Sequence, residues 1–566
     1  MYRLLNLLGF RKKIFFSILV FASIFASFME VLGLGLLIPI VSSLLDNSIY
    51  LKFNNFFSNY GLITFTHNSF LYFCIILLPT IFIFKNLFLL FFHYLEANLI
   101  FNTLRDFSKK IYKIFLFQKY EFYINESSSN FFTKLGSELA ILQNYLISSV
   151  IYITELIILT SLVLFLLYFV FEEVIIILAV VVICISIFYF FFYKKIKNLG
   201  SSRKKFELKK TKTILETDRG IKEIKIYNRE SIFENYFNQN NQKIHEFLKK
   251  YYVIQKIPKL FFEAIAILTV SILLYVLLKN NSSSDIIVKL TLVTGAIIRI
   301  LPSLNKVIHA YNTRKYSMPA IDDIFRFIKR LKIKNSFNKK DVKKFVDNIK
   351  ISKVKFNYKN RDNNHLIFEN LNLKIKKSDK IAIMGDSGSG KSTLIDIILG
   401  FLAPDKGKIT VDKITNINQI LKNMISYCPQ YIYIFDKSIE KNISLEDQYE
   451  KIDFIKIKKL KKICCLNTFS NSNKKKQLLG EGGIKISGGQ KQRIGIARAL
   501  YFERDILILD ESLNAIDTKT SKKIIKNILL NYPNLTIILV THSIELAKMT
   551  KKIYKIQNKT LKLNIN

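Results

Sequence analysis

The stretch Gly385-Asp386-Ser387-Gly388-Ser389-Gly390-Lys391-Ser392-Thr393 lies between an apolar, β-branched run at 381–384 and a helical pattern at 394–399. The order is therefore strand, glycine-rich loop and helix. Glycines let backbone N–H groups turn inward around phosphate oxygens, and the helix N-terminus adds its positive dipole end. Lys391 can reach the β- and γ-phosphates, and Ser392 can bind Mg²⁺. The stretch predicts a nucleoside triphosphate site, and a chance glycine turn is the alternative.

The composition indicates a chain with two kinds of domain. Of its 566 residues, 50% are hydrophobic and 23% are charged, which is an unusual combination for one soluble globule. We therefore expect one membrane part and one soluble part. The net charge of +42 suits nucleic acid or a cytoplasmic membrane surface, and a compositional bias of the whole proteome is the alternative explanation.

Apolar runs precede the phosphate loop, and each is near the length needed to span hydrocarbon. The first has no small-residue cleavage site and is too long for a signal peptide, so we interpret it as an uncleaved membrane helix. Lys and Arg gather in the segments 93–144 and 194–257 and are scarce in 46–68, which predicts that both termini are cytoplasmic. The predicted spans are 14–45, 69–92, 145–171, 173–193, 258–278 and 286–309.

The two cytoplasmic connections are far longer than ordinary connections, and 104–117 and 213–226 keep helical apolar spacing. We expect the membrane helices to continue into the cytoplasm, with a short segment across each tip near 123–132 and 227–237. Ordinary loops are the alternative. In the first outward loop, 49–60 has one apolar helical face, which predicts a short helix on the outer membrane surface or one packed against its own domain.

The predicted domain order follows from the change in pattern along the chain. A transmembrane domain covers 1–320, and a polar, basic linker covers 321–345. Strand and helix patterns alternate over 346–566, as in an α/β domain. The fold class expected is an α-helical six-span transmembrane domain followed by an α/β P-loop nucleotide-binding domain.

Further polar groups follow apolar strands in the second part. The strand 506–509 ends at Asp510 and Glu511. Asp510 is placed to hold Mg²⁺ through water, and Glu511 to polarise the attacking water. A second glycine turn opens a helix and makes a second anion site, with the residues Ser487, Gly488, Gly489 and Gln490.

Three more residues complete the pattern. Gln430 and His542 each follow a predicted strand, and Tyr358 lies in a strand where its ring can stack on a base. Taken singly, a histidine or tyrosine in such a place is more often structural. The order and the combination of all these motifs favour a functional site.

Over about 350–556 these motifs resemble the nucleotide-binding domain of an ABC transporter, and with the six spans the chain resembles an exporter half-transporter. The resemblance implies a homodimer, with ATP and Mg²⁺ as cofactors and ATP hydrolysis coupled to transport. Each ATP would lie between the phosphate loop of one subunit and the signature turn of the other. The implied catalytic residues are Glu511, His542 and Gln430; the metal ligands are Ser392, Gln430 and Asp510; the signature residues 487–490 act from the partner, with Asp517 at the dimer seam.

Two stretches depart from the family pattern. Ser378-Asp379 stands where Gly-Glu is usual, and 512–517 reads Ser-Leu-Asn-Ala-Ile-Asp in place of Ala-Thr-Ser-Ala-Leu-Asp. We expect neither departure to touch the γ-phosphate chemistry. In the sixth span, 299–305 reads Arg-Ile-Leu-Pro-Ser-Leu-Asn, which resembles the lipid-linked oligosaccharide flippases of bacterial protein N-glycosylation.

Charges inside membrane spans are costly and usually functional. The candidates for a substrate path are Lys85, Lys259 and Arg299. Lys85 can snorkel, and a glutamate four residues after Lys259 can neutralise it. Arg299 points to an anionic group such as a pyrophosphate, unless it pairs with Glu30 or Glu155 and only holds the bundle together.

These features together predict ATP-driven flipping or export of an anionic lipid-linked substrate, a lipid-linked oligosaccharide, by a homodimer in the bacterial inner membrane. The alternatives are export of other lipids, drugs or peptides, and a non-pumping membrane protein gated by ATP. The intact Glu511 and His542 favour a pump. The six spans argue against nucleic acid as a partner.

Overall fold

The structure is a computed structural model that describes residues 10–36, 40, 43, 66–169, 171–280, 283–330, 344–359, 364–412, 414, 423–466 and 478–564. It divides into two compact units. The first comprises Met1–Gln118 and Tyr123–Ile333, and the second comprises Lys119–Phe122 and Lys334–Asn566. The predicted outer-surface helix at 49–60 lies outside the described residues.

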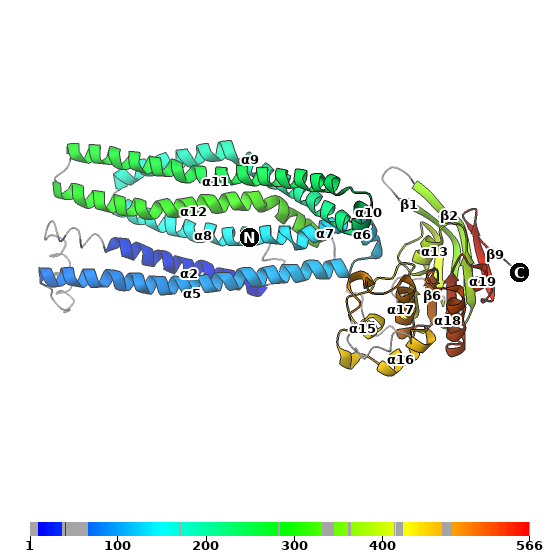
Figure 1. Cartoon of the computed structure of the whole chain (residues 1–566). Coiled ribbons are helices and arrows are strands. Elements are labelled where there is room, and N and C mark those ends of the chain that lie inside the picture. Colours follow the sequence, from blue (N-terminus) through cyan, green and yellow to red (C-terminus); the bar gives the residue numbers. More distant parts are fainter. Residues whose placement is uncertain are drawn as a thin grey trace. The chain divides into compact units, whose positions relative to one another are not determined.

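The first unit is a bundle of long helices (Figure 1). Each long helix overlaps one of the predicted apolar runs. By length and hydropathy, three helices within the described residues could cross a membrane: Phe10–Gly33, His67–Leu116 and Ser128–Tyr168. The helices are α2 (Phe10–Gly35), α5 (His67–Leu116), α6 (Tyr120–Asn125), α7 (Ser128–Leu135), α8 (Ser137–Phe169), α9 (Phe171–Arg219), α10 (Ile221–Ile226), α11 (Glu230–Asn280) and α12 (Ser283–Arg330).

The predicted continuation of the apolar helices into polar sequence is confirmed, because α5 and α9 each run unbroken through the change in composition. At the first tip, α6 begins three residues before the predicted 123–132. At the second tip, the predicted segment 227–237 is wrong. The short helix there is α10, and it ends before Asn228, whose positive φ of 53° breaks the helix ahead of α11.

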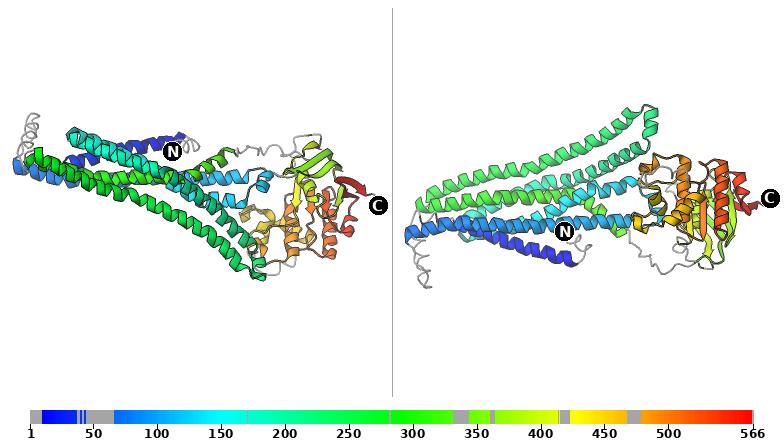
Figure 2. Two further views of the ribbon diagram at one scale, coloured as in Figure 1. Left: turned by 90° about the horizontal axis from the view of Figure 1, so that it is seen from above. Right: turned by 60° about the horizontal axis from the view of Figure 1, so that its bottom comes forward.

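Close helix packing holds the first unit together. Figure 2 shows α9 and α11 side by side in both views. Gly200 of α9 lets α12 approach, because a Cβ there would collide with the carbonyl oxygen of Tyr316. A buried ion pair of 3.1 Å between Arg203 and Glu138 joins α9 to α8. The polar ends of these helices are therefore fixed to one another.

The second unit has a six-stranded sheet in the order β5-β6-β7-β3-β8-β9 and a three-stranded sheet in the order β2-β1-β4. In the larger sheet the neighbouring strands β5, β6, β7, β3 and β8 are parallel, and β9 is antiparallel to β8. The strands are β1 (Asn348–Lys359), β2 (Asn364–Lys376), β3 (Lys380–Met384), β4 (Lys406–Val411), β5 (Ile425–Cys428), β6 (Ile506–Asp510), β7 (Thr536–Val540), β8 (Lys552–Gln557) and β9 (Thr560–Asn564).

Two apolar cores cover the larger sheet, so β6 and β7 are buried at every position. One core packs α13 between the sheets, and the other packs α16, α17 and α18 on the opposite face. The predicted fold class is confirmed, and α12 continues to Arg330 through the start of the predicted linker. The helices are α13 (Lys391–Ile398), α15 (Ile439–Ser444), α16 (Phe454–Ile463), α17 (Gly488–Tyr501), α18 (Thr518–Asn531) and α19 (Ile544–Ala547).

Parallel strand order positions the candidate site. The carboxyl ends of β3, β5, β6 and β7 meet at one edge of the sheet. The phosphate loop, Gln430, Asp510 and His542 follow these ends in the chain. Residues up to about 160 positions apart thus reach one place, as ligand sites of parallel sheets do.

Candidate functional site

The phosphate loop joins β3 to α13 and is shaped by its glycines. Gly388 and Gly390 have φ values of 77° and 102°, which side chains other than glycine rarely adopt. Lys391 curls back over the loop, because its Nζ donates to the first two loop carbonyls at 3.0 Å each. Ser389 Oγ is buried and has no hydrogen-bond partner among the described residues. This unused polar group and the ring of loop N–H groups fit the phosphates of ATP.

Four side chains from separate parts of the unit converge on the carboxylate of Glu511. Gln430 Nε2 lies 2.9 Å from Oε2, and His542 Nε2 lies 3.1 Å from Oε1. Lys391 Nζ lies 3.7 Å from Oε1, and Asn514 Nδ2 donates to Oε2 at 3.2 Å. A carboxylate held beside the phosphate-loop lysine is suited to polarise a water next to the γ-phosphate.

Asn514 corrects one expectation from the sequence. The departure at 512–517 was expected to stay clear of the γ-phosphate chemistry, but Asn514 contacts Glu511 directly. The sequence held a usable signal, since Asn514 follows Glu511 by only three residues. In the structure the backbone N–H of Asn514 also donates to the backbone carbonyl of Glu511 at 3.2 Å. The departure therefore changes the donors around the candidate base.

Asp510 has a partner that the sequence reasoning missed. The Tyr427 hydroxyl of β5 donates to Asp510 Oδ2 at 3.0 Å. Aligning the carboxyl ends of β5 and β6 would have suggested this contact. Tyr427 pairs with Ile508, and Asp510 follows Ile508 by two residues, so both side chains lie on the same face of the sheet. Burial raises the pKa of the Asp510 carboxyl, and the neighbouring Glu511 charge adds to the rise.

The residues around Asp510 fit Mg²⁺ rather than a soft metal. Mg²⁺ beside a nucleotide takes one or two protein oxygens and completes its shell with phosphate and water. Ser392 and Asp510 supply such oxygens, and the described residues contain no cluster of three or more His, Cys, Asp or Glu. When bound, Mg²⁺ would neutralise charge that develops on the phosphates.

The second glycine turn forms a capped helix start. Ser487 caps α17, and it exchanges hydrogen bonds with Gln490 in a capping box. A Cβ on Gly489 would lie 2.9 Å from the carbonyl oxygen of Ala515, so glycine is needed for the close approach. Among the described residues, no side-chain hydrogen bond or ion pair joins this turn to the phosphate loop of the same chain. Asp517 caps α18 by accepting the Thr520 N–H at 2.8 Å.

Tyr358 lies at the end of β1, next to the phosphate loop. Its hydroxyl is 3.3 Å from Thr393 Oγ1, in the first turn of α13. Its ring packs at right angles to Phe356, with the ring centres 5.0 Å apart. This position agrees with a role beside a bound nucleotide, and the stacking itself stays a prediction.

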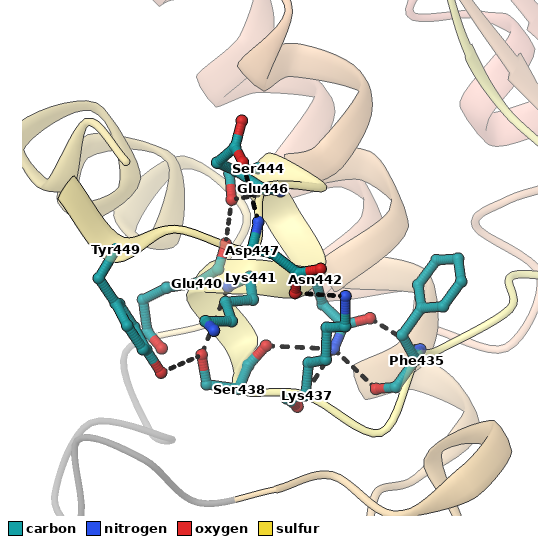
Figure 3. Close-up of polar contacts among 10 residues, drawn as sticks. All are labelled: Phe435, Lys437, Ser438, Glu440, Lys441, Asn442, Ser444, Glu446, Asp447 and Tyr449. Atoms are coloured by element: carbon teal, nitrogen blue, oxygen red, sulfur yellow. Dashed lines mark hydrogen bonds and ion pairs between the residues drawn. The ribbon is translucent and has the colours of Figure 1, made fainter. Parts of the chain in front are cut away.

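A polar network fixes the chain that follows Gln430. The fully buried Asn442 of α15 donates to the carbonyls of Phe435, Lys437 and Ser438 at 2.9–3.2 Å (Figure 3). Arg498 of α17 donates to the Asn442 carbonyl at 2.8 Å. The network therefore joins the segment after Gln430 to the helix that begins with the signature turn.

The three substrate-path candidates do not share one environment. Lys85 is buried, and its ammonium group lies 4.5 Å from the centre of the Phe82 ring. Lys259 is exposed and lies 3.7 Å from Glu263, one helical turn away. Arg299 pairs with Glu30 of α2. Within the described residues, these three cations share no hydrogen-bond or ion-pair partner.

The pairing of Arg299 has a counterpart that the sequence reasoning missed. Lys306 Nζ lies 2.6 Å from Glu155 Oε1 of α8. Arg299 and Lys306 are seven residues apart, so they lie two turns apart on one face of α12. The carboxylates are 4% and 10% exposed, whereas the cations are 42% and 60% exposed. Each cation is therefore anchored by a buried acid and still presents an open side.

Comparison with known families matches both units. Residues 16–301 match the family described as ABC transporter transmembrane region, and residues 368–514 match the family described as ABC transporter. A solved bacterial Atm1-family ABC exporter with ATP bound has the same fold, with a TM-score of 0.77 and 18% identity, over 96% of this chain and 95% of that one.

Curated relatives match over shorter stretches. An ATP-dependent lipid A-core flippase of Wigglesworthia glossinidia brevipalpis is 28% identical over 60% of this chain and 59% of its own length. The lactococcin-G-processing and transport protein LagD of Lactococcus lactis is 36% identical over 39% of this chain and 30% of its own. The chain thus spans about a third to three fifths of these relatives.

Proposed function

We propose that this chain, which belongs to the ABC transporter family, is an ATP-driven flippase for an anionic lipid-linked substrate in the bacterial inner membrane. The nucleotide chemistry rests on the four side chains around Glu511. In the proposed reaction, Glu511 polarises water, Lys391 and the loop N–H groups bind the phosphates, and His542 orients the γ-phosphate end. Mg²⁺ would be held by Ser392, Gln430 and Asp510.

A homodimer is part of this proposal. The chain has one phosphate loop and one signature turn, and an ATP site shared between copies needs one of each from different subunits. Gly489 of the signature turn approaches the Ala515 carbonyl oxygen. Among the described residues no hydrogen bond or ion pair joins this turn to the phosphate loop of its own chain, which supports such sharing. Both termini would face the cytoplasm.

The observation that carries the substrate class is the pair of anchored cations on α12. Arg299 and Lys306 keep open sides two turns apart, while Glu30 and Glu155 hold their other sides. A pyrophosphate has charge at two oxygen-rich centres, so it suits two cations along one path. The proposed substrate is therefore a lipid-linked oligosaccharide, whose linkage carries phosphate. Lys85 and Lys259 are further candidates along the path.

The test uses purified protein in proteoliposomes with a fluorescent pyrophosphate-linked lipid saccharide. We expect ATP-dependent flipping and a rise in ATP hydrolysis with this lipid. A neutral glycolipid with the same chains is the control for charge, and a drug and a peptide test the other exporter classes. Flipping of the neutral lipid at the same rate would overturn the anionic-substrate proposal, and absence of ATP-dependent movement for every probe would overturn the pump.

A further inference from the structure

A polar cavity lies in the ATP-binding unit, away from the phosphate loop. Its walls include residues that precede β3, β6 and β7, so it lies at the amino ends of these parallel strands. The cavity volume is about 570 Å³, which is within the range of small-ligand sites. The residues that carry the inference are Lys344, Lys377, Arg504, Ser378, Ser426 and Tyr532.

The cations of this cavity are largely unused by the protein. In the described part of the chain, neither the Lys344 side chain nor the Lys377 side chain forms an ion pair or a hydrogen bond. Arg504 donates one N–H to the carbonyl oxygen of Asn423 at 2.7 Å and pairs with no carboxylate among those residues. Lys344, Lys377 and Arg504 therefore give one wall of the cavity positive charge and several N–H donors.

The carboxylates on the same wall are already engaged. Asp505 Oδ2 accepts the backbone N–H of Phe345 at 2.9 Å, which fixes the start of the domain. Glu503 forms an ion pair of 2.9 Å with Lys456. Lys456, which is not part of this wall, neutralises Glu503, so Lys344, Lys377 and Arg504 face one remaining carboxylate and the cavity has an excess of positive charge.

Two serines add hydroxyl groups to the wall. Ser426 of β5 is 7% exposed, and its Oγ has no hydrogen-bond partner in the structure's described residues. Ser378 stands where the family pattern has glycine, and its φ of 62° is the conformation that glycine adopts readily. Its Oγ donates to the carbonyl oxygen of Asn534 at 3.0 Å. The substitution thus places a hydroxyl beside the cavity at the expense of backbone strain.

We propose that this cavity binds a soluble phosphorylated small molecule of nucleotide size. The phosphate would be held by Lys344, Lys377 and Arg504, and Ser426 would donate its free hydroxyl proton. The organic part would lie against the apolar wall of Tyr532, Pro533 and Leu535. Ser426 is four residues before Gln430, so the occupant contacts the strand that leads to the ATP site.

The experiment uses the full chain in nanodiscs of neutral phospholipid. A saturating non-hydrolysable ATP analogue with Mg²⁺ fills the phosphate loop, and equilibrium binding of inorganic pyrophosphate and of AMP is then measured. We expect saturable binding of both probes. The double variant K344Q/K377Q should lower the affinity about tenfold or more, and S426A should lower it about threefold, because charge-assisted bonds exceed neutral ones.

The matched control is K374Q/K408Q, which removes two exposed lysines from β2 and β4 and should leave both affinities within about twofold. Equal losses in the control would show a general charge effect and overturn the site. So would a wild type without saturable binding. If K344Q/K377Q no longer binds the ATP analogue, S426A decides, and an unchanged affinity there refutes the proposal. Loss of pyrophosphate binding in discs with phosphatidylglycerol would identify a lipid headgroup instead.

Discussion

The two units surround their important carboxylates in different ways. In the ATP-binding unit, four side chains contact the Glu511 carboxylate: Lys391, Gln430, Asn514 and His542. Gln430 and Asn514 are neutral, and His542 can titrate. In the transmembrane unit, Glu30 and Glu155 each pair with one cation of α12. A shared carboxylate can exchange partners when a ligand arrives, whereas a buried acid with one partner holds that cation in place. The first arrangement suits chemistry, and the second suits presenting a cation to a substrate.

The largest expected effect comes from breaking the shared carboxylate. E511Q keeps the size of the side chain but removes the charge that polarises water, and its amide NH₂ cannot accept the hydrogen bonds that one carboxylate oxygen accepts. ATP hydrolysis should fall about 10²- to 10⁴-fold, and ATP binding should persist because the phosphate cradle is intact. Turnover and nucleotide affinity of the same preparation check this. Unchanged turnover would mean that another group polarises the water.

The next effect comes from breaking a fixed pair. E30Q leaves the Arg299 guanidinium without its acid, and we expect a loss of about 2–3 kcal/mol in the free energy of unfolding, since the cation keeps partial access to its surroundings. Thermal unfolding in detergent measures it. The double variant E30Q/R299Q should recover most of the loss. If the double variant is no more stable than E30Q, the pair does not stabilise the bundle.

A smaller effect is expected at Asp396 of α13. Burial, with the nearby Asp510 charge, raises the pKa of this carboxyl to about 6, against an ordinary value near 3.8. A raised folded-state pKa makes stability highest below about pH 4 and lowers it as the pH rises through about 6. D396N should therefore gain about 1–2 kcal/mol over wild type at pH 8 and almost nothing at pH 4. An equal gain at both pH values would assign the effect to packing.

The smallest effect is expected at Asn514. Its Nδ2 donates to Glu511 Oε2 and so occupies a carboxylate oxygen that could otherwise accept from the attacking water. N514S restores the usual family residue and should raise ATP turnover about two- to threefold without changing nucleotide affinity. Steady-state ATPase assays on matched preparations check this. A tenfold fall would instead show that Asn514 positions Glu511.

The sequence predicted the two units unequally, for a physical reason. The phosphate loop, the signature turn and the strand before Asp510 are short local patterns, and backbone rules fix their geometry. The partner of Arg299 depends on helix packing between residues 269 positions apart, which no local pattern determines. The sequence offered Glu30 and Glu155 as partners of Arg299. Lys306 was not considered, because it lies close to the end of the predicted span 286–309. The second tip also differs from prediction, because Asn228, with its positive φ, ends the helical run ahead of α11.

The most direct test of the central claim is the amount of pyrophosphate-linked lipid saccharide flipped per ATP hydrolysed. The comparison is between wild type and R299Q/K306Q in the same type of proteoliposome, with K205Q/K212Q, which removes two exposed lysines of α9, as the charge-matched control. We predict that the ratio falls about tenfold or more in the double variant and stays near wild type in the control. An unchanged ratio in a well-folded R299Q/K306Q protein would contradict the account.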